Sequence, residues 1–130
     1  MAGEQVLVVE DNEKNMKLFR DVLQASGYRL LEATTGEQAV DLATTHTPDL
    51  VLMDIQLPDI DGLQLTREFK ADPDLRDIPV VAVTSYAMKG DRQKSVDAGC
   101  DGYITKPIDT RQFPLEIEKY LRGTGTGSSG

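Results

Sequence analysis

The sequence lacks several features that mark particular classes of protein. No apolar run approaches the roughly 18 to 20 residues that cross a bilayer, so we expect no membrane-spanning helix. Only a short apolar run follows Glu4 and Gln5, so no signal peptide is recognised and we expect a cytoplasmic protein. The single cysteine, Cys100, excludes an internal disulfide and agrees with a reducing compartment.

Positive charge is also scarce. The chain has 14 Lys and Arg residues against 22 Asp and Glu residues, which gives a net charge of −8. Direct nucleic-acid binding needs a basic surface that neutralises phosphates, so this balance argues against it. The length of 130 residues, with 39% hydrophobic and 28% charged residues, suits one soluble domain with a real core.

Short apolar runs alternate with amphipathic stretches along the chain. Periodicity predicts strands at 5–9, 29–32, 50–54, 79–84 and 102–105, and helices at 12–26, 35–46, 62–71, 89–98 and from 113 onward. Thr35 and Gln38 have the spacing of a capping box at the start of the second helix. Pro114 fits only the first turn of a helix, so the last helix is expected to begin near Phe113.

The same pattern predicts the architecture. The first, third and fourth strands are continuous apolar runs, as a parallel sheet covered on both faces requires. Five strand-helix units with short connections indicate an α/β sandwich with right-handed crossovers. We expect one domain over residues 4–122. Residues 123–130 have linker composition and are expected to form a flexible tail, a linker or a remnant of an expression vector.

Polar residues stand where the expected strands end. Glu10 and Asp11 follow the first strand, Asp54 ends the third, Thr84 ends the fourth and Lys106 follows the fifth. All carboxyl ends of a parallel sheet meet at one edge. Three acids brought close together repel, and Mg²⁺ with its preference for oxygen ligands would offset that repulsion. This set suits phosphoryl transfer to a carboxylate, with Asp54 as nucleophile, Lys106 as a point charge and Thr84 as a hydroxyl donor.

Several sequence motifs together resemble the receiver domain of two-component response regulators over about residues 4–122. The matching pieces are Val8-Val9-Glu10-Asp11-Asn12, Leu52-Met53-Asp54-Ile55-Gln56-Leu57-Pro58, Gly62, Pro79-Val80-Val81-Ala82-Val83-Thr84 and Tyr103-Ile104-Thr105-Lys106-Pro107. Two further phrases, Asn15-Met16-Lys17-Leu18-Phe19 and Ala87-Met88-Lys89-Gly90-Asp91, look like single-domain cell-cycle regulators of the DivK type. The resemblance implies an α/β receiver fold, flavodoxin-like, with a five-stranded parallel sheet of order 2-1-3-4-5 and five flanking helices.

The resemblance also implies the composition of the site. Asp54 is expected to accept the phosphoryl group. Glu10, Asp11, Asp54 and the backbone carbonyl of Gln56 are expected to hold Mg²⁺, for which Mn²⁺ could substitute.

The remaining implied roles concern signalling. Lys106 is expected to pair with the phosphoryl oxygens, and Thr84 and Tyr103 to act as a switch pair. A histidine kinase or histidine phosphotransfer protein would donate the phosphoryl group. The surface of the fourth helix, fifth strand and fifth helix would contact a downstream protein, and the chain would be a monomer or a weak homodimer. Such a protein is a switch that catalyses its own phosphoryl transfer and dephosphorylation, rather than an enzyme with another substrate.

Two alternatives remain open on the sequence. A phosphohydrolase of the haloacid dehalogenase type also uses an aspartate after a strand, but it needs a second acid two residues later, where this chain has Gln56. A degenerate receiver would act as a constitutive interaction module, and the complete set of acids argues against it.

Overall fold

Strands and helices alternate through the computed structural model, which describes residues 3–84, 91–106 and 108–123. In chain order the elements are β1 (Gln5–Val9), α1 (Glu13–Ala25), β2 (Arg29–Ala33), α2 (Gly36–His46), β3 (Leu50–Asp54), α3 (Gly62–Ala71), β4 (Val80–Thr84), α4 (Asp91–Ala98), β5 (Gly102–Thr105) and α5 (Phe113–Gly123). Residues 87–90 and Pro107 of the matching motifs, and the expected tail at 124–130, lie outside the described residues. Within the described ranges, no helix is long and apolar enough to cross a membrane.

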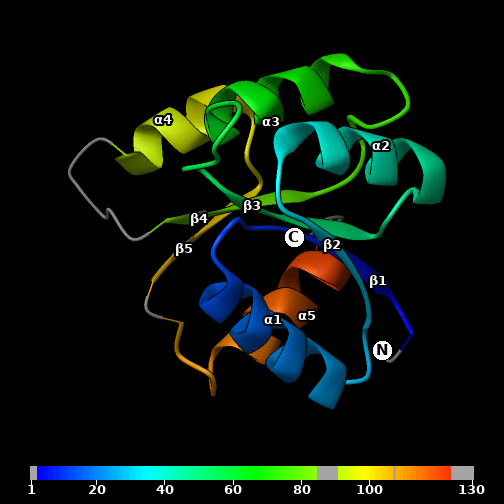
Figure 1. Cartoon of the computed structure of the whole chain (residues 1–130), viewed down its shortest axis with the longest axis vertical. Coiled ribbons are helices and arrows are strands. Elements are labelled where there is room, and N and C mark those ends of the chain that lie inside the picture. Colours follow the sequence, from blue (N-terminus) through cyan, green and yellow to red (C-terminus); the bar gives the residue numbers. More distant parts are fainter. Residues whose placement is uncertain (1–2, 85–90, 107, 124–130) are drawn as a thin grey trace.

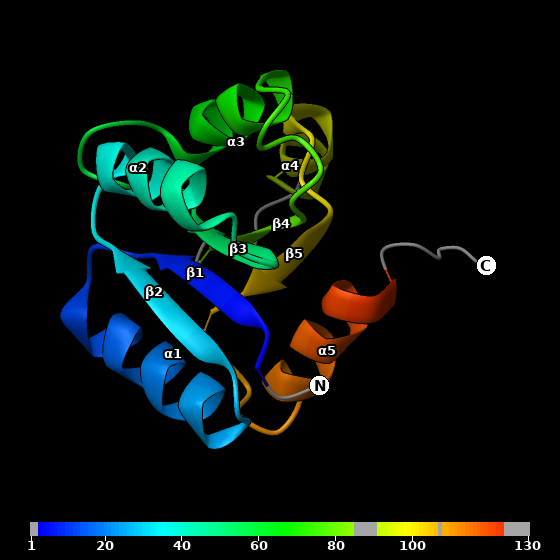
Figure 2. The same cartoon turned by 90° about the vertical axis from the view of Figure 1, so that its right-hand side faces the viewer.

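The five strands form one parallel sheet of order β2-β1-β3-β4-β5. Helices α1 and α5 cover one face of the sheet, and α2, α3 and α4 cover the other (Figures 1 and 2). This arrangement confirms the predicted fold class. The sequence order reverses direction in space between β1 and β3, so the crevice at their carboxyl ends is the expected place for a site.

The core follows from the alternation of side chains along each strand. Val6 and Val8 of β1 point into the layer of α1 and α5, where Phe19 and Phe113 pack with ring centroids 5.5 Å apart. Leu7 and Val9 belong to the opposite core, with Leu65, Phe69 and the small residues Ala39 and Ala43. Each fully buried valine, leucine or phenylalanine side chain stabilises the fold by about 1.5–3 kcal/mol. Because both faces are covered, the strands carry unbroken apolar runs.

The local boundaries show where side chains replace missing helical hydrogen bonds. Asn12 caps α1 by accepting a hydrogen bond from the Asn15 N–H, which leaves Asp11 outside the cap. Thr35 caps α2 by accepting from the Gln38 N–H at 3.2 Å. The predicted capping box is wrong in its second half, because the Gln38 side chain accepts from the Thr34 N–H and not from Thr35.

Other boundaries agree closely with the predictions. α5 begins at Phe113 with Pro114 in its first turn, as the missing N–H of proline requires. β2 extends to Ala33, one residue further than expected, and β4 begins at Val80 instead of Pro79. α5 runs through Gly123, which the sequence had placed in the tail.

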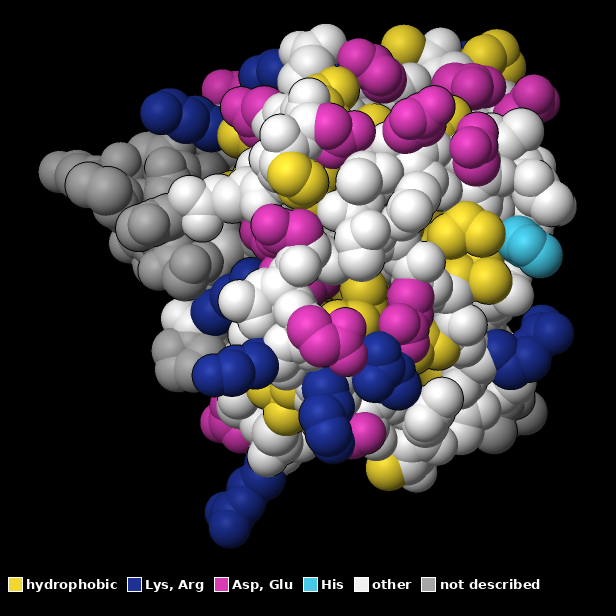
Figure 3. Space-filling model, viewed as in Figure 1, with side chains coloured by type: hydrophobic (Ala, Val, Ile, Leu, Met, Phe, Trp, Pro, Cys, Tyr) yellow, Lys and Arg dark blue, Asp and Glu magenta, His cyan; other side chains and the backbone are white. Residues whose placement is uncertain are grey.

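Charge is distributed unevenly over the two helical layers. Asp and Glu side chains gather over the layer of α2, α3 and α4, whereas several Lys and Arg side chains lie over the layer of α1 and α5 (Figure 3).

Candidate functional site

Four of the predicted site residues meet at the carboxyl edge of the sheet. Val9 pairs with Met53 in the register of β1 and β3, so the residues that follow them, Glu10 and Asp54, are neighbours. Carboxylate oxygens of Glu10, Asp11 and Asp54 all lie within 4.8 Å of one another. Glu10 and Asp54 are buried, with 1% and 4% of their surface exposed, whereas Asp11 is exposed.

Lys106 supplies the positive charge of this group. Its Nζ donates to Glu10 Oε1 at 2.8 Å and lies 3.6 Å from Asp54 Oδ2. The Lys106 side chain is 13% exposed, so the pair with Glu10 is largely removed from water. The Lys106 backbone N–H donates to the Thr84 carbonyl oxygen at 2.7 Å, which fixes the start of the segment after β5. The two side chains stay paired because either charge, buried without the other, would be uncompensated.

Backbone donors hold the two buried carboxylates in place. The Gln56 N–H donates to Asp54 Oδ1 at 3.0 Å, and the Asn12 N–H donates to Glu10 Oε2 at 3.2 Å. The sequence did not identify either contact, because any residue other than proline offers the same donor. Each carboxylate therefore has one oxygen held by backbone and one directed toward Lys106.

The electrostatic environment of Asp54 is unusual for a carboxylate. Burial raises the pKa of Asp54 from its ordinary value of 3.8 to about 7, and the charge of Glu10 acts in the same direction. The Gln56 N–H and the charge of Lys106 lower this pKa and only partly offset the effect of burial. A site that raises the cost of an anion in this way gains stability from an added cation.

The loop between β3 and α3 ends at Gly62, which lies so close to the Asp54 backbone that a residue with a Cβ atom would not fit there. The Gly62 N–H donates to the Ile55 carbonyl oxygen at 3.0 Å, and Gln56 forms an isolated bridge with Asp61. A Cβ atom on Gly62 would overlap the Asp54 carbonyl oxygen and the Ile55 Cα. The glycine in the matching motif is thus required by this close contact, and Asp61 caps the helix that follows.

Asp59 anchors the same loop to the start of α2. Its Oδ1 accepts from the Gly36 N–H at 2.8 Å and its Oδ2 from the Glu37 N–H at 3.3 Å. The hydrogen bond from Gly36 contributes most to lowering the pKa of Asp59. No motif in the sequence indicated this contact, because the two partners are more than twenty residues apart and one of them is backbone.

Thr84 and Tyr103 occupy neighbouring strands. Thr84 ends β4 with 1% of its surface exposed, and it lies opposite Thr105 in the register with β5. Tyr103 is half-buried on the edge strand β5, where it lines hollows beside α4 and α5 and not the acidic group. The two residues therefore lie on the adjacent strands β4 and β5, with β5 at the edge of the sheet.

The chain is similar to known signalling proteins over nearly its whole length. The family model described as the response regulator receiver domain matches residues 6–118. The polar-differentiation response regulator DivK of Brucella ovis is 53% identical over 116 residues, which cover 89% of this chain and 94% of that protein.

Solved structures agree with this result. The receiver domain of a sensor histidine kinase from Pseudomonas aeruginosa PAO1, crystallised with a magnesium ion coordinated in its active-site cleft, has 35% identity and a TM-score of 0.85 over 92% of this chain and 98% of that chain. The phosphorylated cyanobacterial phytochrome response regulator RcpA has 29% identity and a TM-score of 0.81 over 95% of this chain and 96% of that chain. The acidic edge, the fold and the sequence relationships agree, and the chain belongs to the response-regulator receiver domain family.

Proposed function

We propose that this receiver domain is a phosphorylation-activated signalling switch that accepts a phosphoryl group on Asp54. The observation that carries the proposal is the convergence of Glu10, Asp11 and Asp54 within 4.8 Å, with the Lys106 ammonium among them. The buried pair of acids, Glu10 and Asp54, serves no packing purpose, since apolar residues of the same volume would stabilise the sheet edge better.

The chemistry at Asp54 follows from the two oxygens of its carboxylate. Oδ1 is held by the Gln56 N–H, whereas Oδ2 is directed toward Lys106. In the proposed step Oδ2 attacks the phosphorus of a phosphohistidine. The bond from phosphorus to the imidazole nitrogen breaks as the new bond to oxygen forms, and the imidazole keeps the electron pair and takes up a proton. Lys106 then lies beside the transferred group, where its charge offsets that of the phosphoryl oxygens.

The donor set at this edge fits a divalent cation. Glu10, Asp11, Asp54 and the backbone carbonyl of Gln56 are the proposed ligands, all of them oxygens, which Mg²⁺ prefers and Mn²⁺ also accepts. When bound, such an ion would neutralise the carboxylates and polarise the phosphoryl group. The magnesium ion in the related Pseudomonas receiver domain supports this assignment.

The signal would leave the site through β4 and β5. In the proposed switch the buried hydroxyl of Thr84 donates to a phosphoryl oxygen, and Tyr103 on β5 responds. The surface of α4, β5 and α5 then changes its affinity for a downstream protein. A partner can shift this equilibrium only if it binds the two states differently.

Further parts of the proposal concern partners and turnover. The phosphoryl donor is a histidine kinase or histidine phosphotransfer protein in the cytoplasm, and the chain is a monomer or weak homodimer. The domain also catalyses its own dephosphorylation. Receiver domains as a family are signalling proteins and not enzymes with a separate substrate.

Incubation with acetyl phosphate and Mg²⁺, followed by intact mass measurement, tests the proposal. We expect a mass gain of one phosphoryl group that disappears with the Asp54→Asn variant and with a chelator. An Asp74→Asn variant removes one exposed charge elsewhere and serves as the control. A mass gain that persists in Asp54→Asn would overturn the assignment of the acceptor. Steady hydrolysis of a small phosphate ester would instead favour the phosphohydrolase alternative.

A further inference from the structure

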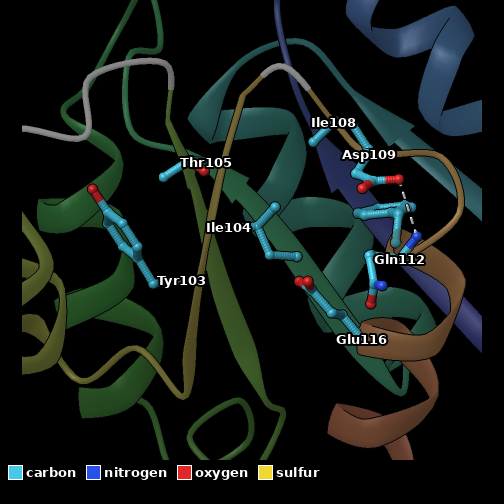
Figure 4. A pocket seen from close by; sticks show the side chains of 8 residues that line it. Tyr103, Ile104, Thr105, Ile108, Asp109, Gln112 and Glu116 are labelled. Atoms are coloured by element: carbon cyan, nitrogen blue, oxygen red, sulfur yellow. Dashed lines mark hydrogen bonds between the residues drawn. The ribbon is translucent and has the colours of Figure 1, made fainter.

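A pocket of about 340 Å³ lies between the edge strand β5 and the first turns of α5. Apolar side chains form part of its wall, and polar side chains from the loop and from α5 face it (Figure 4). The apolar members are Ile104, Ile108 and Phe113, and the polar members include Asp109, Gln112 and Glu116. The pocket is separate from the acidic edge, which is built from the ends of β1 and β3.

The polar groups in this pocket are incompletely paired. Figure 4 shows the Glu116 carboxylate directed toward Ile104, across the opening. Within the described part of the chain, no hydrogen bond or ion pair reaches that carboxylate, although Glu116 is half-buried. Asp109 uses Oδ1 for the backbone N–H groups of Arg111 and Gln112, at 2.9 and 3.3 Å, and no hydrogen bond among the described residues reaches its second oxygen. A carboxylate partly removed from water beside apolar walls favours a cationic partner.

We propose that this pocket binds an arginine side chain of a partner protein. The methylene groups of the arginine lie along Ile104 and Ile108, and the guanidinium pairs with Glu116 and Asp109. Arginine suits the site because its planar group donates several hydrogen bonds at once, while its stem covers apolar surface. Arginine is also, with tryptophan and tyrosine, one of the side chains that most often contribute strongly to binding at protein interfaces.

Other classes of ligand fit the pocket less well. Its volume stands near the lower end of the roughly 300–1,000 Å³ of small-molecule sites, so it suits a side chain better than a cofactor. Two carboxylates repel phosphate-bearing ligands. Among the described residues, the only group of three acidic, His or Cys side chains that could hold a metal is Glu10, Asp11 and Asp54. The pocket is therefore assigned to a protein cation.

The position of the pocket connects it with the proposed output surface. Its wall includes Tyr103 and Thr105 of β5, and Thr105 directly precedes Lys106. The inference deepens the proposed function and rests on it for the claim that β5 and α5 face a downstream partner. If phosphorylation changes the affinity of the pocket for arginine, then occupancy of the pocket must change the equilibrium constant of phosphoryl transfer by the same factor.

A peptide titration of the unphosphorylated full chain tests the pocket independently of Asp54. The probe is N-acetyl-leucyl-arginine amide, and the matched probe carries citrulline, which keeps the shape of arginine without its charge. We expect saturable shifts in the ¹H–¹⁵N NMR spectrum at the amides of Ile104, Ile108, Gln112 and Glu116. The citrulline probe should bind about tenfold more weakly, a difference of about 1.4 kcal/mol.

Two variants and one control complete the experiment. Glu116→Gln should weaken arginine binding at least about fivefold, and Asp109→Asn should weaken it less, because asparagine keeps the hydrogen bonds to the loop. Glu37→Gln, which removes one exposed charge on α2, should leave binding unchanged. Equal binding of the two probes, shifts spread over all acidic surfaces, or an unchanged affinity in Glu116→Gln would overturn the proposal. The mass test with acetyl phosphate is unaffected by any of these outcomes.

Discussion

Lys106 lies closer to Glu10 than to Asp54, with its Nζ 2.8 Å from Glu10 Oε1 and 3.6 Å from Asp54 Oδ2. The lysine therefore acts as the internal counter-ion of the acidic edge and hydrogen-bonds the acid that is not the proposed nucleophile. A metal ion at the three carboxylates would compete with Lys106 for Glu10. If the proposed function holds, binding of a cation would favour release of Lys106 toward the phosphoryl position.

Replacement of Lys106 by methionine tests this relationship. The variant keeps an unbranched stem but leaves Glu10 and Asp54 without their counter-ion. Without metal, we expect the free energy of unfolding to fall by about 2–4 kcal/mol, because removal of one partner leaves a buried charge uncompensated. Added Mg²⁺ should restore more stability to the variant than to the unaltered protein, since no lysine competes for the acids. Urea denaturation with Mg²⁺ and with a chelator measures both effects.

Lys17→Met provides the control for this experiment. Lys17 pairs with Asp21 at 2.7 Å on the exposed side of α1, so its loss should change stability little. Stability of Lys106→Met equal to that of the unaltered protein in the presence of chelator would contradict the role of Lys106 as counter-ion.

A second prediction concerns the dependence of stability on pH. Burial raises the pKa of Asp54 from 3.8 to about 7 in the folded protein, so the folded state binds this proton more tightly than the unfolded chain does. The stability that Asp54 contributes is therefore full below about pH 3.8 and is lost as the pH rises to 7. Asp54→Asn, which stays neutral, should be more stable than the unaltered protein above pH 7 and similar to it near pH 4.

The size of this effect follows from the shift in pKa. One pKa unit corresponds to about 1.4 kcal/mol, so we expect Asp54→Asn to gain about 2–4 kcal/mol at pH 8 in the presence of chelator. Mg²⁺ should reduce the gain, because the unaltered protein then binds a cation. Denaturation curves at pH 4.5 and pH 8 measure the difference. A gain that is the same at both pH values would exclude ionisation of Asp54 as its cause.

The sequence predicted the members of the acidic edge because a parallel sheet brings all carboxyl strand ends together. Glu10 and Asp54 are each the first polar residue after an apolar run, and Asp11 and Lys106 directly follow Glu10 and Thr105, so all four positions follow from the strands. Residue type and periodicity were sufficient for these four. Thr84 and Tyr103 were placed on the correct strands, whereas their proposed movements require a second state.

The contacts that hold the site were not predictable in the same way. The Gln56 and Asn12 N–H groups bind carboxylates through backbone atoms that every residue except proline possesses. The Asp59 contact depends on the distance between a loop and a helix that only the tertiary structure sets. The capping-box pattern also predicted the wrong partner for Gln38, whose side chain accepts from the Thr34 N–H and not from that of Thr35.

The third prediction concerns the glycine at the start of α3. A Cβ at position 62 would overlap backbone atoms of Asp54 and Ile55, which cannot move without displacing the proposed acceptor. Gly62→Ala should therefore lower the free energy of unfolding by about 1–3 kcal/mol and slow phosphorylation by acetyl phosphate. Gly36→Ala is the matched control, because its main overlap is with a side-chain methyl of Ile60, which can rotate. An equal loss in both variants would show that backbone overlap is not decisive.

The last prediction concerns Asp59, which connects the loop after Asp54 to the start of α2. If this contact positions the Gln56 carbonyl for the proposed metal, Asp59→Ala should weaken Mg²⁺ binding by about tenfold, as loss of outer contacts at metal sites does. Asp59→Asn should retain much of the affinity, because its Oδ1 can still accept from the Gly36 N–H. Asp74→Ala removes the same charge from an exposed position and reports the effect of net charge alone. Isothermal titration with Mg²⁺ separates the possibilities: equal losses in Asp59→Ala and Asp74→Ala would leave only a charge effect. If Asp59→Asn retains its affinity for Mg²⁺ while Asp59→Ala loses it, the hydrogen bond from Gly36 and not the charge of Asp59 supports metal binding.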